Sequence, residues 1–134
     1  MLAVPEGFLD IPYVGRRHPG APDDGDLRAG ANCQRFAYAL LAHFGRVVPP
    51  LRSSDLWEDT THTRRVQTLQ PLDLLLWSRD GAAWGAHVGV YLGDGHAVHL
   101  CRAVGIPAIW PLSRFEETPR YRVLLGAKRA TRVR

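Results

Sequence analysis

The segment CQRFAYALLAHF has apolar residues at a helical spacing, because every fourth residue from Phe36 to Phe44 is apolar and other apolar residues lie beside them. This spacing predicts an amphipathic helix over residues 33–44. Asn32 precedes the helix as a good N-cap, and Gly45 follows it as a good stop signal.

From residue 69 onward the pattern is typical of strands. Apolar runs predict five of them, over residues 72–78, 87–92, 96–100, 105–112 and 121–128. The residues GDG between the second and third strands predict a hairpin. Pro107 and Pro111 place the fourth strand at a sheet edge. A helix followed by a meander of about five antiparallel strands defines an α+β fold, with the helix packed on one side of the sheet.

The remaining segments complete the layout. Residues 15–31 are rich in Gly, Pro and Asp and predict a long loop. The segment SSDLWEDTTH predicts a second, short helix over 53–62, capped by Ser53 or Ser54. The 134 residues contain no repeat and are expected to form one domain, 1–134, that can bury a core of its own.

Composition and charge exclude several classes of protein. The apolar fraction of 46% is ordinary for a globular chain, and the formal net charge is +4. The basic tail KRATRVR is interpreted as a solvated terminus, so no nucleic-acid partner is expected. No apolar stretch is long enough to span a membrane. The oligomeric state is left open.

Two cysteines, Cys33 and Cys101, are too few for a disulfide framework. The first fifteen residues lack a basic segment followed by a long apolar segment, so no secretory signal is visible. We therefore expect a cytoplasmic protein, or one that is exported by a route without a signal peptide.

Cys33 follows the predicted N-cap directly, which places a thiol at the first turn of a helix. Backbone N–H groups at a helix start carry partial positive charge, which stabilises a thiolate and can also bind a developing oxyanion. Cys33 is therefore a candidate nucleophile, although a small buried hydrophobic residue is the alternative interpretation.

A thiol nucleophile needs a base, and histidine is the usual one. Three of the six histidines lie on the predicted hairpin, His96 among them, and the candidate pair is His87 on one arm and His99 on the other. A two-residue turn would place their side chains on opposite faces. A three-residue loop over 93–95, which suits the glycine at its last position, pairs His99 with Gly89 and brings both histidines to one face. Their Cα atoms would then be about 7–8 Å apart.

We therefore expect a relay from Cys33 to His87 to His99, in which His87 accepts the thiol proton and His99 fixes its tautomer. A zinc site built from His87, His96, His99 and Cys101 is the competing interpretation. The spacing of these residues is poor for a shared ion, so neither a metal nor another cofactor is expected. Cys101 is interpreted as a packed strand residue.

Four stretches carry a resemblance to the NlpC/P-sixty family of bacterial papain-like cysteine peptidases, which covers about residues 11–128. NCQRFAYALLAHFG is similar to the cysteine-bearing helix of the family, and LQPLDLLLW to its strand motif Leu-Gln-Pro-Gly-Asp-Leu. HVGVYLGDGHAVHL is similar to the histidine hairpin. IPYVG resembles the motif whose tyrosine lines the site, which makes Tyr13 a candidate for oxyanion or substrate binding.

The resemblance implies a papain-like fold and amide hydrolysis through an acyl-enzyme thioester. Peptidoglycan stem peptides of the γ-D-glutamyl type, or related small peptides, are the implied substrates. The family usually has Asp-Cys-Ser-Gly, and here Asn32 and Gln34 flank the cysteine, so the charge that holds a substrate amine is lost. Leu72 replaces the usual glycine. Arg35 is interpreted as solvated, and Trp84 as either a pocket wall or ordinary packing.

Two other functions remain open at this point. The same triad could transfer an acyl group or cleave a non-peptide amide, as the altered Asn32 and Gln34 suggest. A non-catalytic binding module could also retain the fold. An amine-dependent product would favour the first, and an unreactive Cys33 would favour the second.

Overall fold

The structure is a computed structural model that describes residues 1–22 and 25–134. Its three α-helices are α1 (Cys33–His43), α2 (Ser53–Glu58) and α3 (Leu112–Glu116), with single 3₁₀ turns at Glu6–Phe8, Leu27–Ala29 and Pro119–Tyr121. Its strands are β1 (Arg46–Val47), β2 (Thr63–Val66), β3 (Leu74–Ser78), β4 (His87–Gly93), β5 (His96–His99), β6 (Ala108–Pro111), β7 (Val123–Ala130) and β8 (Arg132–Val133).

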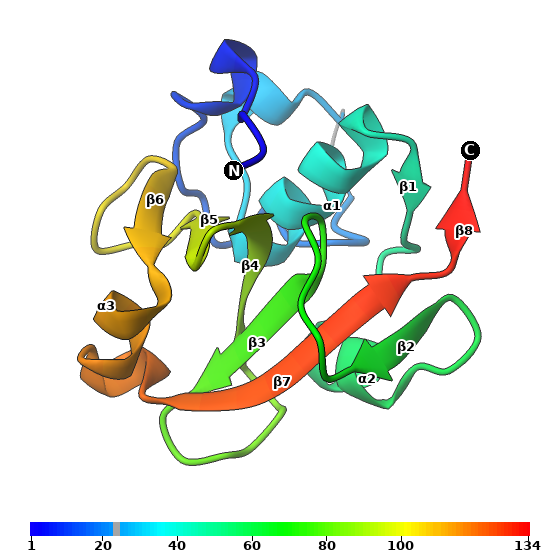
Figure 1. Cartoon of the computed structure of the whole chain (residues 1–134). Helices are drawn as coiled ribbons and strands as arrows, with labels where there is room; N and C mark the ends of the chain where they lie inside the picture. The colour runs from blue at the N-terminus through cyan, green and yellow to red at the C-terminus, as the bar shows by residue number, and fades with distance from the viewer. Residues whose placement is uncertain (23–24) are drawn as a thin grey trace.

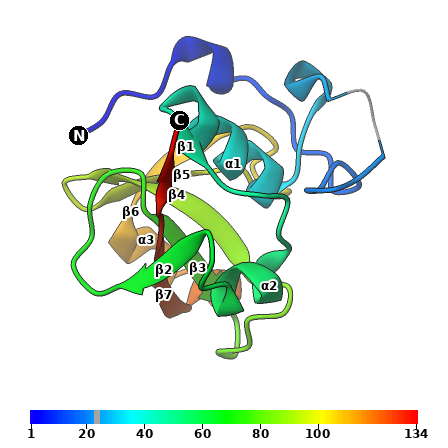
Figure 2. The ribbon, with the colours of Figure 1, turned by 90° about the vertical axis from the view of Figure 1, so that its right-hand side faces the viewer.

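Six strands form one antiparallel sheet in the order β2-β7-β3-β4-β5-β6, and β1 pairs with β8 separately (Figure 1). The helix α1 covers one side of this sheet, and the N-terminal segment lies on the same side in both views (Figures 1 and 2). The predicted α+β class is confirmed, with six strands where about five were expected. The strand β6 lies at the sheet edge, as its prolines predict.

The two faces of the sheet bury different side chains. The α1 face is aliphatic and contains Leu74, Leu76, Val88, Val90, Leu92 and Val98. The opposite face, covered by α3, is largely aromatic and contains Leu75, Trp77, Ala97, Trp110, Phe115 and Tyr121. This division follows from the strand period of two, which sends alternate residues of β3 and β4 to opposite faces.

The helices are shorter than their predicted ranges. The helix α1 ends at His43, one residue early, and Asn32 caps it as predicted. The second helix ends at Glu58, because the carboxylate of Asp59 accepts hydrogen bonds from backbone N–H groups of the following loop. The residue that precedes it is Arg52, without a side-chain cap, so the prediction of a serine cap is wrong.

Sequence patterns missed the short strands β1, β2 and β8, which contain too few apolar residues to show a period. The fourth predicted strand, 105–112, is reduced to Ala108–Pro111. The predicted loop 15–31 holds only one 3₁₀ turn within its described part, and positions 23–24 lie outside the described residues.

The predicted strand 72–78 begins two residues late, at Leu74, because Leu72 adopts a left-handed backbone conformation with φ of 79°. This conformation favours glycine, since a Cβ atom is strained there. It also explains why a glycine is expected at this position in the strand motif quoted above.

The β4–β5 hairpin reaches the predicted register by a different route. Gly93 pairs with the first residue of β5, so the turn has two residues and not the predicted three. Asp94 and Gly95 have positive φ values of 50° and 72°, which suit a tight turn. A bulge just before Gly93 adds one residue to β4 and compensates for the shorter turn. His99 therefore shares a face with His87, as predicted.

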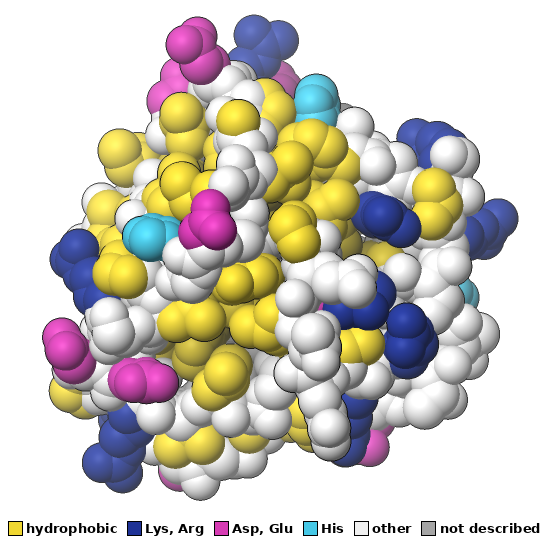
Figure 3. Space-filling view, in the orientation of Figure 1, with side chains coloured by type: hydrophobic (Ala, Val, Ile, Leu, Met, Phe, Trp, Pro, Cys, Tyr) yellow, Lys and Arg dark blue, Asp and Glu magenta, His cyan; other side chains and the backbone are white. Residues whose placement is uncertain are grey.

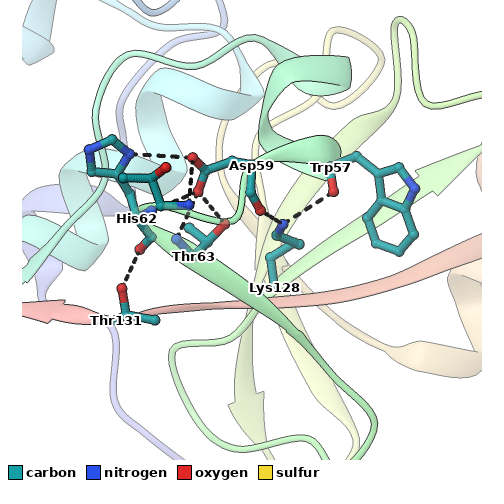
Figure 4. A network of polar contacts seen from close by, with 7 residues as sticks. Trp57, Asp59, His62, Thr63, Lys128 and Thr131 are labelled. Atoms are coloured by element: carbon teal, nitrogen blue, oxygen red, sulfur yellow. Dashed lines mark hydrogen bonds and ion pairs between the residues drawn. The ribbon is translucent and has the colours of Figure 1, made fainter.

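A buried lysine links α2 to the central sheet (Figure 4). The Lys128 ammonium donates hydrogen bonds to the carbonyl oxygens of Trp57 and Asp59. The Asp59 carboxylate accepts from the backbone and hydroxyl of Thr63 and from the backbone of His62. Burial raises the pKa of Asp59, but these hydrogen bonds outweigh it and lower the pKa to about 2. The network therefore holds β2 and β7 against the end of α2.

Basic side chains gather at one side of the face drawn in Figure 3, over β1, β2 and β8, whereas hydrophobic side chains occupy its centre. The basic residues Arg132 and Arg134 at the C-terminal end of the chain are exposed, as the composition predicts. Within the described ranges, no helix has the length and apolar character that a bilayer crossing requires.

Candidate active site

Cys33 begins α1 on the side that faces the start of β4. Asn32 fixes this end of the helix, because its side-chain oxygen accepts the backbone N–H of Arg35 at 2.9 Å and its own N–H donates to the Arg17 carbonyl at 3.0 Å. The Cys33 side chain is partly exposed and free of any disulfide. The helix start thus places one free, partly buried thiol beside the start of β4.

Burial raises the pKa of the Cys33 thiol to about 11, although hydrogen bonds from the backbone N–H groups of Val88, Gln34 and Cys33 itself oppose this shift. The position of Cys33 at a helix start, taken alone, predicts a lowered pKa instead. The donors are present as predicted, but burial outweighs them. The resting group at neutral pH is therefore a protonated thiol.

His87 and His99 are hydrogen-bonded, with 2.9 Å between Nε2 of His87 and Nδ1 of His99. Burial and the neighbouring His99 hold the pKa of His87 well below its ordinary value. Burial and the positive charge of Arg114 lower the pKa of His99 to about 4. Both imidazoles are therefore neutral at pH 7, and His87 keeps Nδ1 for another partner.

Aromatic rings enclose the histidine pair. Tyr121 stacks on His87 with a centroid distance of 4.4 Å, and Trp110 and Phe115 contact His99 edge to face at 4.2 and 4.6 Å. Sequence analysis did not single out these three residues, since they come from β6, α3 and the 3₁₀ turn before β7. Only the topology of the sheet brings them to the hairpin.

Gly89 lies on β4, two residues after His87, at a position that has no space for a side chain. A Cβ atom there would lie 2.9 Å from the Trp77 ring and 3.1 Å from the Val98 carbonyl oxygen. Trp77 in turn stacks on Phe115 at 4.0 Å, so Gly89 admits the aromatic layer that supports the histidines.

A groove crosses Cys33 and consists of two cavities of about 410 and 500 Å³. They share the residues Tyr13, Cys33, Trp84, Gly85 and Ala86. His87 lines the first cavity, whereas Asn32 and Gln34 line the second. Trp84 is 84% exposed, so it is a wall of the groove and is not packed in the core. The groove can therefore accept an extended ligand on both sides of the thiol.

Tyr13 is held at this groove by a backbone bridge to Ala31 and by its N–H, which donates to the Gly105 carbonyl at 2.8 Å. Burial, with Cys33 nearby, raises the pKa of its hydroxyl, which stays protonated and able to donate. The guanidinium of Arg102 lies 5.9 Å from the Tyr13 ring. Arg102 is a site residue that sequence analysis missed, because it lies in a turn without a motif.

Arginine is the prevailing charge in the first cavity. Of the described residues that line it, the charged ones are Arg79, Asp80, Arg102 and Arg120, all of them exposed. In the second cavity Arg52 is matched by Asp55. The half of the groove beside His87 is thus electropositive, and the other half is balanced.

Asn32 and Gln34 line the second cavity, but both have structural bonds. The Asn32 oxygen caps α1, and the buried Gln34 amide donates to the Leu51 carbonyl at 3.4 Å. Arg35 lines a separate cavity on the far side of α1, together with Tyr38. Arg35 therefore does not contribute to the groove.

The residues of the alternative metal site are not assembled. Among residues 1–22 and 25–134, no three His, Cys, Asp or Glu side chains are placed to hold an ion. His96 instead contacts the Asp94 carbonyl at the turn, at 2.8 Å. Cys101, expected to be a packed strand residue, is buried just after β5 and lines the first cavity with Cys33.

Comparisons with known proteins identify the fold. No family model and no curated protein matches the sequence. Among solved structures, an NlpC/P60 family protein from Bacillus cereus is 25% identical with a TM-score of 0.61, over 90% of this chain and 35% of that protein. The chain thus spans about a third of that relative. It has an NlpC/P60-like fold, as its resemblance predicts.

Two peptidoglycan hydrolases are also similar. The NlpC/p60 domain of SagA is 19% identical with a TM-score of 0.58, over 93% of this chain and 91% of that domain. RipB from Mycobacterium tuberculosis is 19% identical with a TM-score of 0.59, over 92% of this chain and 58% of that protein. At these identities the likeness concerns the fold alone.

Proposed function

We propose that this protein is a thiol hydrolase that cleaves an amide bond through a thioester. The observation that carries the proposal is the 2.9 Å hydrogen bond between His87 and His99 at the wall of the groove that contains Cys33. A nucleophile, a base and a residue that orients the base are the minimal set for such chemistry.

Both the thiol and the imidazole are neutral at rest, so proton transfer must accompany attack. The Cys33 sulfur attacks the carbonyl carbon while Nδ1 of His87 takes the thiol proton. His87 then gives that proton to the leaving amine, and the C–N bond breaks to leave a thioester on Cys33. Water, deprotonated by His87, attacks the thioester, and the acid and the free thiol are released.

The developing oxyanion needs donors that are already in place. The backbone N–H of Cys33 and the hydroxyl of Tyr13 serve this purpose in the proposed mechanism. Tyr13 fits the role because its raised pKa keeps its proton on the oxygen. Trp84 forms a wall that Asn32 and Gln34 extend on the other side of the thiol.

The substrate we propose is a peptide of cell-wall type, such as a γ-D-glutamyl stem peptide or a related small peptide. Support comes from the fold shared with peptidoglycan hydrolases and from a groove that is open on both sides of Cys33. The arginines of the first cavity favour a substrate with a carboxylate on the His87 side.

The test is hydrolysis of γ-glutamyl peptides, followed by mass spectrometry, with Cys33→Ala as the matched inactive variant. We expect turnover to fall at least about 10⁴-fold in Cys33→Ala with an unchanged melting temperature, since the nucleophile is lost and only one sulfur atom is removed from the fold. Equal rates in both proteins would refute the mechanism. A product that forms only with an added amine would indicate acyl transfer instead.

The charge preference has its own control. We expect Arg102→Gln to raise KM several-fold for a substrate with a carboxylate and to leave KM unchanged for its carboxamide analogue. Arg52→Gln, in the balanced half of the groove, should alter neither value. An equal effect on both substrates would refute the charge preference.

The raised pKa of Cys33 favours one second candidate, a binding module that retains the fold without catalysis. In that case peptides would bind to the groove and remain uncleaved. Calorimetric binding without any product in the hydrolysis assay would establish this candidate.

A further inference from the structure

The imidazole of His99 is fully buried, and its second nitrogen has no conventional partner. Nδ1 contacts His87, whereas Nε2 is without a hydrogen-bond partner among the described residues. The rings of Trp110 and Phe115 lie 4.2 and 4.6 Å away between centroids, inclined by 66° and 63°. The buried ring that carries Nε2 is therefore packed against two aromatic side chains.

Two arrangements of protons satisfy the 2.9 Å bond between the neutral rings. In the first, His87 donates from Nε2 to Nδ1 of His99, so the remaining proton of His99 is on Nε2. In the second, His99 donates from Nδ1, so its Nε2 has a lone pair and the proton of His87 moves to Nδ1. Only the first arrangement leaves Nδ1 of His87 able to accept a proton.

Aromatic surroundings distinguish between these arrangements. The face of an aromatic ring carries partial negative charge, which attracts an N–H group and repels a lone pair. A buried lone pair beside Trp110 and Phe115 would have no donor and would be repelled. A buried N–H at the same position has weak but favourable contacts with the rings.

We propose that Trp110 and Phe115 are positioning residues, which hold His99 as its Nε2–H tautomer and thereby make Nδ1 of His87 a base. The consequence for catalysis rests on the proposed function, but the tautomer itself does not. In this way aromatic rings perform the task that a carboxylate or amide acceptor performs in other triads.

Charged groups near the pair support the neutral form of His99. The Arg114 guanidinium lies 4.1 Å from the centroid of the Trp110 ring, and its charge opposes protonation of His99. Arg120 and Asp80 line the adjoining cavity on the His87 side. A neutral His99 has one ring proton, so the tautomer alone decides which way the bond to His87 points.

The direct test is made on the wild-type protein, and one variant serves only to assign its signals. Long-range ¹H–¹⁵N correlation spectra of the labelled wild-type protein at neutral pH identify which nitrogen of each imidazole is protonated, and His99→Asn assigns the signals. We expect Nε2–H in both rings, with the His99 proton shifted upfield by the ring currents. A His99 proton on Nδ1 overturns the proposal, whether or not the protein hydrolyses any amide.

A cycle of variants tests the consequence for catalysis. If Trp110→Leu lowers the fraction of the competent tautomer to about a tenth, kcat should fall about tenfold with KM unchanged. Trp110→Phe retains an aromatic face and should lose less than Trp110→Leu. The His99→Asn protein offers an amide oxygen to His87 whatever surrounds it, so adding Trp110→Leu there should cause no further loss of kcat.

A loss of equal size in both backgrounds would mean that Trp110 acts only on the fold, and would overturn the positioning role. If Trp110→Leu does not fold, the tautomer in the wild-type spectrum decides the proposal. If the wild type shows the expected tautomer but cleaves no substrate, the proposed function fails and the tautomer assignment stands.

Discussion

The two faces of the central sheet come from alternate residues of the same strands, but they have different roles. On the α1 face the strands bury Leu and Val residues, whose packing stabilises the fold and carries no chemistry. On the α3 face the same strands bury His99 against Trp110 and Phe115. One face is built for stability, and the other supports a neutral histidine pair beside the thiol.

Each face also buries a side-chain nitrogen atom, and the two atoms have different surroundings. Lys128 lies on the α1 face, opposite Leu74 in the ladder, and its ammonium has carbonyl partners on Trp57 and Asp59. Nε2 of His99 has no hydrogen-bond partner among the described residues, and its ring contacts Trp110 and Phe115. A charged nitrogen requires oxygen acceptors in the interior, whereas a neutral one can be satisfied by rings.

The largest expected effect concerns the thiol of Cys33, at the start of α1. Because burial raises the pKa of Cys33 to about 11, its thiolate fraction should rise about tenfold per pH unit below that value. We therefore expect alkylation by iodoacetamide to accelerate about 10³-fold between pH 7 and pH 10. Cys33→Ala measures the labelling of Cys101, which is subtracted. A plateau near pH 8 would show that the backbone N–H donors outweigh burial.

A leucine on the α1 face should affect stability and leave the thiol unchanged. Leu76→Ala removes a fully buried side chain between β3 and α1, and we expect the free energy of unfolding to fall by about 2–5 kcal/mol. Urea unfolding measures this loss. Trp84→Ala is the control, because a side chain that is 84% exposed should change stability by less than about 0.5 kcal/mol. Equal losses would contradict the assignment of Trp84 to the groove wall.

Sequence alone could predict what depends on local periodicity. The helix of Phe36, the cap at Asn32 and the alternation along β4 follow from spacing, and so does the pairing of His87 with His99. The bulge that preserves this pairing could not be predicted, because either turn length fits the residues GDG. Trp110 and Phe115 were missed since their contacts with His99 are tertiary. The raised pKa of Cys33 likewise depends on burial, which a helix start does not reveal.

Replacing the lysine on the α1 face should reduce the free energy of unfolding by less than Leu76→Ala does. Lys128→Met leaves the carbonyl oxygens of Trp57 and Asp59 without the buried ammonium, and we expect a loss of about 1–3 kcal/mol in unfolding free energy. Thermal unfolding followed by circular dichroism measures it. Arg65→Gln is the matched control, since Arg65 also donates to the Trp57 carbonyl but is exposed. An unchanged free energy of unfolding in Lys128→Met would mean that packing of the methionine side chain fully compensates for the lost hydrogen bonds.

The smallest expected effect is on stability and concerns Leu72, two residues before β3, whose φ angle is positive. Leu72 has a φ of 79°, which costs an L-residue with a Cβ about 1–2 kcal/mol and which asparagine tolerates better. Leu72 also packs partly against the α1 core, so Leu72→Asn loses some apolar contact. Leu2→Asn removes a similar, partly buried leucine from the same core without relieving a positive φ. We therefore expect Leu72→Asn to be about 1 kcal/mol more stable than Leu2→Asn in urea unfolding, and equal stabilities would show that the left-handed conformation carries no strain.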